Sequence, residues 1–139
     1  MAGSEAGGTG IAIAFVIVAL AWIAPAPSLG WRPVRPQAAA AITACGQPLY
    51  NAYNDGGELI WFVPEQKVFL DNRQDPYPLP LLRASHALEL DGNYTALFTQ
   101  YGIRCAVVAP TSVTAQRLRA DPAWAVTYAD ERWMVTKRN

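Results

Sequence analysis

The sequence predicts a small α/β domain, with a mixed sheet of about five strands and flanking helices, preceded by one N-terminal transmembrane helix. Two observations carry this prediction. Short β-rich runs alternate with helical segments in the second part of the chain, which is typical of a sheet that is parallel in its centre. A long apolar segment precedes them. The 139 residues leave room for a single domain of about 100 residues after that segment.

The apolar segment runs from Ile11 to Ala24 without a polar side chain. As a helix it would extend about 21 Å, less than the ~30 Å of a hydrocarbon core. No charged residue occurs between Glu5 and Arg32, however, so the span can be longer than its apolar centre. We therefore expect a tail at 1–10 and a transmembrane helix at 11–29.

Two alternatives to a spanning helix stay open, namely a secretory signal peptide and a buried helix. The first ten residues contain Glu5 and no Lys or Arg, which is not typical of a signal peptide. Ala24-Pro25-Ala26 resembles a cleavage site, but Pro27 would follow the cut. The basic residues Arg32 and Arg35 favour a cytoplasmic C-terminus if this is the first helix, and carry less weight if other helices precede it.

We expect a Pro-rich linker at 30–36 and an α/β domain at 37–139. A turn is predicted at 54–57, and Asp91-Gly92 separates two helices. The expected helices span 37–45, 58–63, 79–90, 94–101 and 111–119. The expected strands span 49–53, 67–71, 103–108, 124–128 and 133–136, the last two forming a closing hairpin.

The composition excludes several functional classes. Eleven basic residues balance eleven acidic ones, so we expect no nucleic-acid partner. Hydrophobic residues make up 52% and charged residues 16% of the chain, which excludes disorder over most of its length. The single histidine excludes a His-rich metal cluster, and no phosphate-binding glycine motif occurs. We therefore expect no metal and no cofactor.

A polar loop from Asp71 to Tyr77 follows a predicted strand, at the kind of edge where α/β sheets bind ligands. Arg73 suits a carboxylate or phosphate, and the two acids of the loop suit a cation or sugar hydroxyls. In the alternative interpretation, Arg73 pairs with one of these acids and the prolines stiffen a surface loop. The candidate binding residues of this loop and of the preceding turn are Asp55, Gly56, Gly57, Asp71, Arg73 and Asp75.

The single histidine and the two cysteines give weaker indications of function. His86 lies in a predicted helix three residues before Glu89, which suggests a pair on the helix surface rather than catalysis. Cys45 and Cys105 lack the spacing of a metal or redox motif. Outside the cytoplasm they could form a disulfide that adds about 4 kcal/mol of stability, and otherwise they are small buried hydrophobes.

Several spaced motifs resemble the C-terminal segment of bacterial polytopic membrane proteins of the glycosyltransferase-like, lipid-linked-sugar (GT-C) type. The resemblance covers residues 46–138. Its motifs are Tyr50-Asn51-x-Tyr53-x-x-Gly56-Gly57-x-Leu59-Ile60-Trp61, Val68-Phe69-Leu70-Asp71-x-Arg73-x-Asp75-x-Tyr77, Tyr101-Gly102, Asp121-Pro122-x-Trp124 and Tyr128-x-Asp130.

The resemblance implies an extracytoplasmic α/β domain after the last membrane helix of a bacterial inner-membrane protein. The catalytic acids of such transferases lie between early membrane helices, so it implies a non-catalytic role in packing, partner contact or acceptor binding. The expected partners are the lipid bilayer and other membrane helices or a transferase core. The alternatives are a small exported or tethered binding or enzyme domain, with its own polar site at Asp71–Tyr77, and an interaction module without a ligand.

Overall fold

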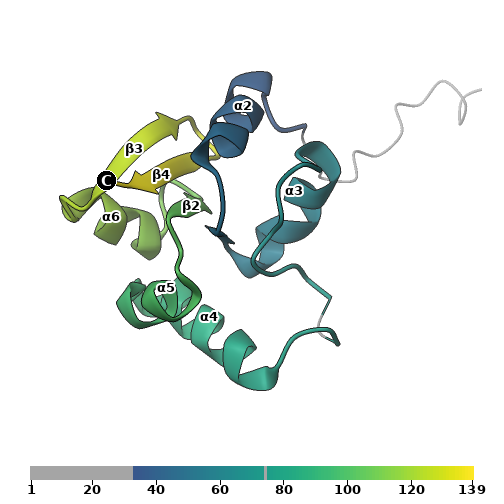
Figure 1. Cartoon of the computed structure of the whole chain (residues 1–139), viewed down its shortest axis with the longest axis vertical. Helices are drawn as coiled ribbons and strands as arrows, with labels where there is room; N and C mark the ends of the chain where they lie inside the picture. The colour runs from purple at the N-terminus through teal and green to yellow at the C-terminus, as the bar shows by residue number, and fades with distance from the viewer. Residues whose placement is uncertain (1–32, 74) are drawn as a thin grey trace, which may run out of the picture. The chain divides into compact units, whose positions relative to one another are not determined.

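The computed structural model describes residues 33–73 and 75–139. The described residues form one compact unit (Figure 1). Its elements are α2 (Pro36–Cys45), β1 (Leu49–Asn51), the 3-10 helix η1 (Tyr53–Asp55), α3 (Gly56–Phe62), α4 (Leu79–Asp91), α5 (Thr95–Tyr101), β2 (Cys105–Val108), α6 (Val113–Ala120), β3 (Trp124–Ala129) and β4 (Met134–Arg138).

The expected transmembrane helix at 11–29 lies outside the described residues. Among the helices that the structure describes, none combines the length and the apolar character needed to cross a bilayer.

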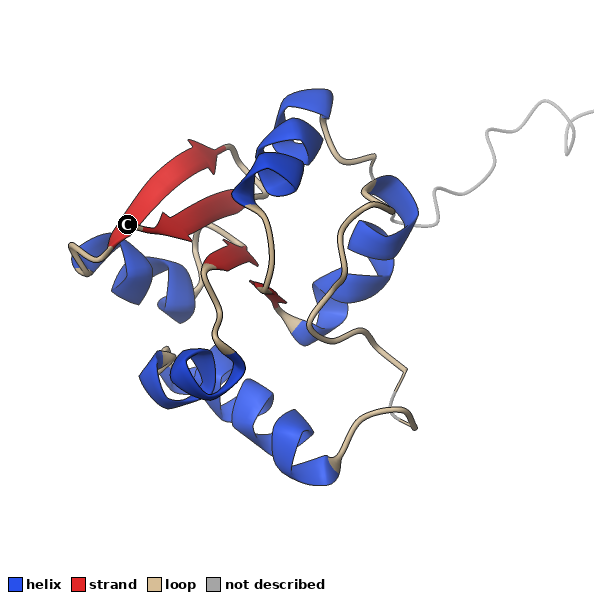
Figure 2. Cartoon of the chain, in the orientation of Figure 1, coloured by secondary structure: helices blue, strands red, loops and turns tan. Residues whose placement is uncertain are grey.

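The α/β prediction is confirmed, with four strands in the described part of the chain instead of about five. The sheet order is β1-β2-β4-β3 (Figure 2). β1 and β2 are parallel, with Tyr50 opposite Ala106. β4 is antiparallel to both of its neighbours, so the predicted closing hairpin is present and one of its strands lies beside β2. The expected parallel centre is wrong, because the central pair of the described sheet is antiparallel and its parallel pair, β1 with β2, lies at one edge.

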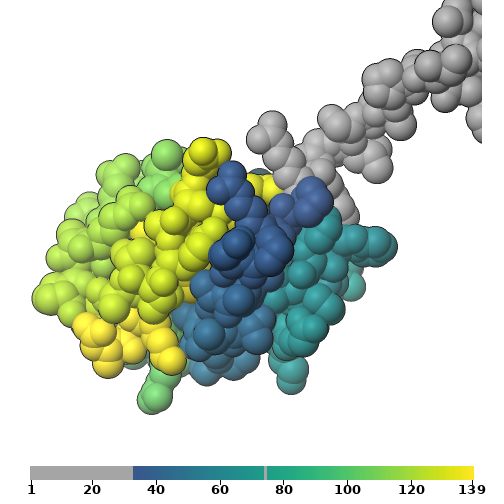
Figure 3. Space-filling model, turned by 90° about the horizontal axis from the view of Figure 1, so that it is seen from above, coloured from purple at the N-terminus to yellow at the C-terminus, as the bar shows by residue number. Residues whose placement is uncertain are grey.

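Helices cover both faces of the sheet, which makes three layers. Successive side chains of a strand point to opposite faces, and β1 and β2 are buried on both faces, whereas β3 is mostly exposed. Leu49 and Val107 belong to a core with residues of α2 and α3, whereas Tyr50 and Val108 belong to a second core with residues of α4, α5 and α6. In Figure 3, α2 lies between the hairpin strands and the α3 segment, in agreement with the first core.

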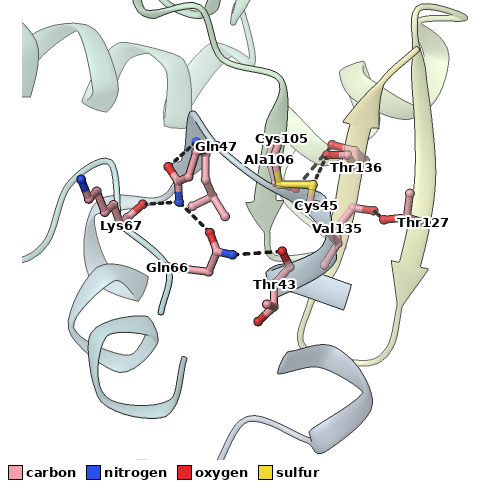
Figure 4. The surroundings of a disulfide bond; sticks show 11 residues. Thr43, Cys45, Gln47, Gln66, Lys67, Cys105, Ala106, Thr127, Val135 and Thr136 are labelled. Carbon is pink, nitrogen blue, oxygen red and sulfur yellow. Dashed lines mark hydrogen bonds between the residues drawn. A yellow bond between two sulfur atoms is a disulfide. The ribbon is translucent and has the colours of Figure 1, made fainter. Parts of the chain in front are cut away.

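The prediction of a strand at 67–71 is wrong. The backbone of this segment is hydrogen-bonded to side chains and not to the backbone of a neighbouring strand. The buried Asn51 accepts a hydrogen bond from the Phe69 N–H at 2.7 Å and donates one to the Leu70 carbonyl at 2.7 Å. At the other end, the Gln47 amide donates to the Lys67 carbonyl at 3.1 Å (Figure 4). The segment therefore follows the free edge of β1 without joining the sheet.

The turn predicted at 54–57 is instead helical, and Gly56 explains why the chain can lie so close to its neighbour there. η1 ends at Asp55 and α3 begins at Gly56, which has an ordinary helical φ of −60°. A Cβ atom on Gly56 would lie 1.9 Å from the Leu70 carbonyl oxygen and 2.8 Å from the Cα of Asp71. The first turn of α3 thus packs directly on the 70–71 backbone.

A disulfide joins Cys45, at the end of α2, to Cys105, at the start of β2 (Figure 4). The two Cα atoms are 5.7 Å apart, and both side chains lie in the core between α2, α3 and the sheet. The bond spans 60 residues of sequence. In the chain-entropy model, a loop of that length corresponds to about 4 kcal/mol of stabilisation.

Replacing Gly56 with Ala is expected to destabilise the fold by about 1–3 kcal/mol, because the added methyl group meets backbone atoms that have no room to move. The gain in helix propensity, at most about 1 kcal/mol, does not offset this clash. Urea unfolding followed by circular dichroism measures the change.

Gly57→Ala is the matched control in the same turn of helix. A Cβ atom there would lie 3.6 Å from the Asn72 Oδ1, an ordinary contact. We expect this variant to be as stable as the parent or up to about 1 kcal/mol more stable. Equal effects of the two substitutions would contradict close backbone packing at Gly56.

Candidate functional site

Asp71 and Arg73 form a closed ion pair in the predicted binding loop. The Asp71 carboxylate accepts hydrogen bonds from the Arg73 N–H at 2.9 Å, from Nε at 3.0 and 3.1 Å and from Nη2 at 2.5 Å. The Asp71 side chain is 1% exposed and that of Arg73 is 71% exposed. The buried carboxylate thus holds the loop in place, and both of its oxygens already accept hydrogen bonds from Arg73.

The electrostatics of Asp71 follow from these contacts. The hydrogen bonds from Arg73 lower the pKa of Asp71 to about 2, against the opposing effect of burial, with a further contribution from Tyr77. A carboxylate that accepts several hydrogen bonds is held in its charged form. This arrangement corresponds to the structural alternative for the loop, in which Arg73 pairs with a neighbouring acid.

The structure brings some of the other candidate residues to this loop and separates one from it. Gly56 packs under the Leu70–Asp71 backbone, and Gly57 lies 3.6 Å from Asn72 Oδ1, so both glycines support the loop by close packing. Asp75 is exposed. Asp55 interacts electrostatically with a different group of acids.

Asp55, Glu58 and Glu89 form this second acidic cluster, apart from the 71–77 loop. Burial raises the pKa of Asp55 to about 6, and the negative charges of Glu58 and Glu89 add to the effect. Arg132 acts in the opposite sense on Asp55, and it forms an ion pair with Glu58. The guanidinium also lies over the ring of Trp133, 5.3 Å from its centroid.

Glu89 has a different role from the one predicted for it. Its carboxylate accepts a hydrogen bond from the Tyr53 N–H at 2.8 Å and so holds the start of η1 to α4. The expected surface pair with His86 is thus replaced by a contact that lies 36 residues away in the sequence. No periodic pattern in the sequence predicts a hydrogen bond between residues so far apart. In the structure Glu89 is half-buried on α4, which is consistent with this bond.

Two cavities are lined by Glu89, a smaller one at the carboxyl ends of β1 and β2 and a larger one between η1 and α4. One has a volume of about 170 Å³ and the other about 310 Å³. The smaller is lined by Tyr50, Ala52, Glu89, Val108, Ala109, Ser112 and Thr114. The larger is lined by Tyr53, Asn54, Leu82, His86 and Glu89. The carboxyl end of parallel strands is where open α/β sheets bind ligands. The sequence placed its candidate residues in the 71–77 loop and in the 54–57 turn, and Asn54 of that turn lines the larger cavity.

Within 33–73 and 75–139, no three His, Cys, Asp or Glu side chains are arranged to hold a metal ion. Comparison with protein-family models, with curated proteins and with solved structures found no match to this chain.

Asp71→Asn is expected to lower the free energy of unfolding by about 2 kcal/mol at neutral pH, because a charge-assisted set of hydrogen bonds is lost. The folded-state pKa of Asp71 lies below its unfolded value, so its contribution is present above about pH 4 and is lost as the pH falls towards about 2. Urea unfolding across that interval should show a weaker acid dependence in the variant.

Asp75→Asn provides the control, since Asp75 is an exposed acid in the same loop. We expect its stability and its acid dependence to match those of the parent. A ligand-binding role for Arg73 without a structural one would instead leave Asp71→Asn as stable as the parent.

Asp55→Asn is expected to have the opposite pH dependence. The raised pKa of Asp55 means that its contribution to stability is complete below about pH 4 and declines as the pH rises through about 6. The variant should therefore be more stable than the parent at about pH 8 and lack the decline between about pH 4 and pH 7. Thermal unfolding in a pH series measures this, and a variant less stable than the parent at alkaline pH would refute it.

Proposed function

We propose that the chain is a membrane-anchored, extracytoplasmic α/β domain of a bacterial glycosyltransferase-like membrane assembly, with a role in packing, partner contact or acceptor binding rather than in catalysis. The observation that carries the proposal is the disulfide between Cys45 and Cys105.

Disulfides persist in oxidising compartments such as the bacterial periplasm and are rare in the cytosol. This one is 5% exposed at Cys45 and fully buried at Cys105, and it ties the first helix of the domain to the second strand of its sheet. Such a position suits a permanent structural bond better than a reactive one. It supports the extracytoplasmic location that the motif resemblance implies.

The geometry of the polar loop supports a structural role for its charged residues. The oxygens of Asp71 are bound by Arg73, and the backbone beneath them is closely packed against Gly56. A general acid or base must reach a substrate proton, and Asp71 is 1% exposed. A role in packing or contact fits this loop better than proton transfer does.

A second candidate function is a small exported binding domain with its own ligand. The two cavities that Glu89 lines favour it. They support a site beside Glu89 for this candidate function, whereas the sequence suggested one at Asp71–Tyr77.

The proposed location is tested in bacterial cells that express the full chain. Cells are quenched with acid, and free thiols are alkylated with a maleimide-linked polymer in denaturant, with and without prior reduction. We expect no mobility shift without reduction and a shift of two adducts after it, because both cysteines are held in the disulfide.

Because the native cysteines are buried, the side of the membrane needs a surface thiol. Gln116→Cys adds one at an exposed position of α6, and a membrane-impermeant maleimide should label it in intact spheroplasts. A double Cys45→Ser, Cys105→Ser variant in the same background is the control for the native thiols. Labelling of the introduced thiol only after lysis, together with free native thiols in the quenched cells, would overturn the proposal.

A further inference from the structure

We propose that Ile60 and Trp61, which we call the α3 pair, lie in the interfacial layer of the same bilayer that anchors the chain. This inference deepens the proposed function and rests on it, because it takes the membrane anchor as given. It assigns the contact between the domain and the lipid to the outer face of one helix.

The α3 pair consists of two neighbouring apolar side chains that are exposed to solvent. Ile60 is 41% exposed and Trp61 is 71% exposed. Within 33–73 and 75–139, the other exposed large apolar side chains are separated along the chain, namely Leu79, Leu90, Tyr101, Val113 and Val126. Single exposed apolar residues are normal on a protein surface. An exposed tryptophan directly beside an exposed isoleucine favours a contact surface instead.

The buried side of α3 fixes the direction of the pair. Leu59 lies within the helix and Val63 follows its end, and each is 1% exposed. Both belong to the core that α3 shares with α2 and one face of the sheet. The α3 pair projects from the remaining surface of the helix. It is therefore held in position by a packed element.

The charge of α3 does not oppose a contact with lipid. The one charged residue of this helix is Glu58, which is 9% exposed and forms an ion pair with Arg132. The next exposed charged residues along the chain, Glu65 and Lys67, lie beyond the end of the helix and have opposite signs. Contact between the α3 pair and lipid thus leaves no charge of this helix unpaired, which would be costly.

The short connection to the predicted membrane helix keeps this part of the domain near the lipid. That helix is expected to end at residue 29, and the described domain begins at Pro33. Four residues span at most about 14 Å. Val34 follows at once and is buried in the same core as Leu59. In Figure 3, α2 and the α3 segment lie side by side, as their shared core requires. The start of the domain and α3 thus belong to one packed region close to the bilayer.

The side chains of the α3 pair suit that position. The indole ring of Trp61 is largely apolar and carries one N–H donor. Tryptophan is therefore enriched at the headgroup level of bilayers, where one part of the ring is in an apolar environment and the other is hydrated. Ile60 adds apolar area that lipid contact removes from water. The α3 pair therefore fits the bilayer interface better than continued exposure to water.

The test uses the full oxidised chain in nanodiscs of phosphatidylethanolamine and phosphatidylglycerol. Ile60→Cys supplies a thiol for a nitroxide label, since the native cysteines are held in the disulfide. Electron paramagnetic resonance measures how often the label collides with oxygen, which concentrates in lipid, and with a nickel chelate, which stays in water. We expect the oxygen-to-nickel collision ratio at position 60 to be several-fold higher than at an aqueous position.

Leu90→Cys provides the matched position, because Leu90 is an apolar side chain of α4 that is 68% exposed. Its label should have the collision ratio of an aqueous site. Trp61→Ser in the Ile60→Cys background should lower the ratio at position 60 to nearly that at position 90, whereas Trp61→Phe should retain most of it. Because Trp61 is largely exposed, both variants should keep the fold, which circular dichroism checks.

The inference is overturned if the chain stays in the nanodiscs and the labels at positions 60 and 90 have the same collision ratio. An unchanged ratio in folded Trp61→Ser would overturn it equally. Dipolar broadening between labels at position 60 would do so as well, because a second copy would then cover α3. These results leave the membrane anchor standing. A chain that does not associate with the nanodiscs would instead overturn the membrane anchor of the proposed function, and this inference with it.

Discussion

The side chain of Asn51 holds together the part of the domain on which its polar features depend. Asn51 is fully buried at the end of β1, where its amide pairs with the backbone of Phe69 and Leu70. A buried backbone segment must find hydrogen-bond partners, and here one side chain replaces a neighbouring strand. This contact brings Leu70 onto Gly56 and fixes the loop that Asp71 then organises.

The disulfide between Cys45 and Cys105 is the second constraint on this part of the domain. It joins α2 to β2 within one of the two cores, and Gln47 links the connection after α2 to Gln66 and Lys67. A sheet with such a short first strand gains little from its own ladder. The covalent bond fixes α2 to β2, whereas the amide side chains of Gln47 and Asn51 hold the 66–70 segment along the free edge of β1.

The acids of the domain fall into two groups with different physical roles. Asp71 is bound by Arg73, and Asp121 accepts the hydroxyl of Tyr94, which lowers the pKa of that acid. Hydrogen bonds of this kind stabilise the charged form and the local backbone. Asp55 is instead held near other carboxylates, so burial and repulsion act in the same direction. Asp55 is therefore held in a strained electrostatic environment, whereas Asp71 is held in a favourable one.

The sequence by itself determined the α/β class, the helices of the second half of the chain and the closing hairpin, because local propensity, glycine caps and hydrophobic patterning agree there. It also identified the Asp71–Arg73 pair as one of two interpretations, since partners two residues apart are visible in the chain. Only the tertiary structure decided that residues 67–71 do not form a strand, because their hydrogen bonds go to Asn51 and Gln47. Likewise, a contact between distant segments placed the Glu89 carboxylate at the Tyr53 amide, and such contacts leave no periodic signal in a sequence.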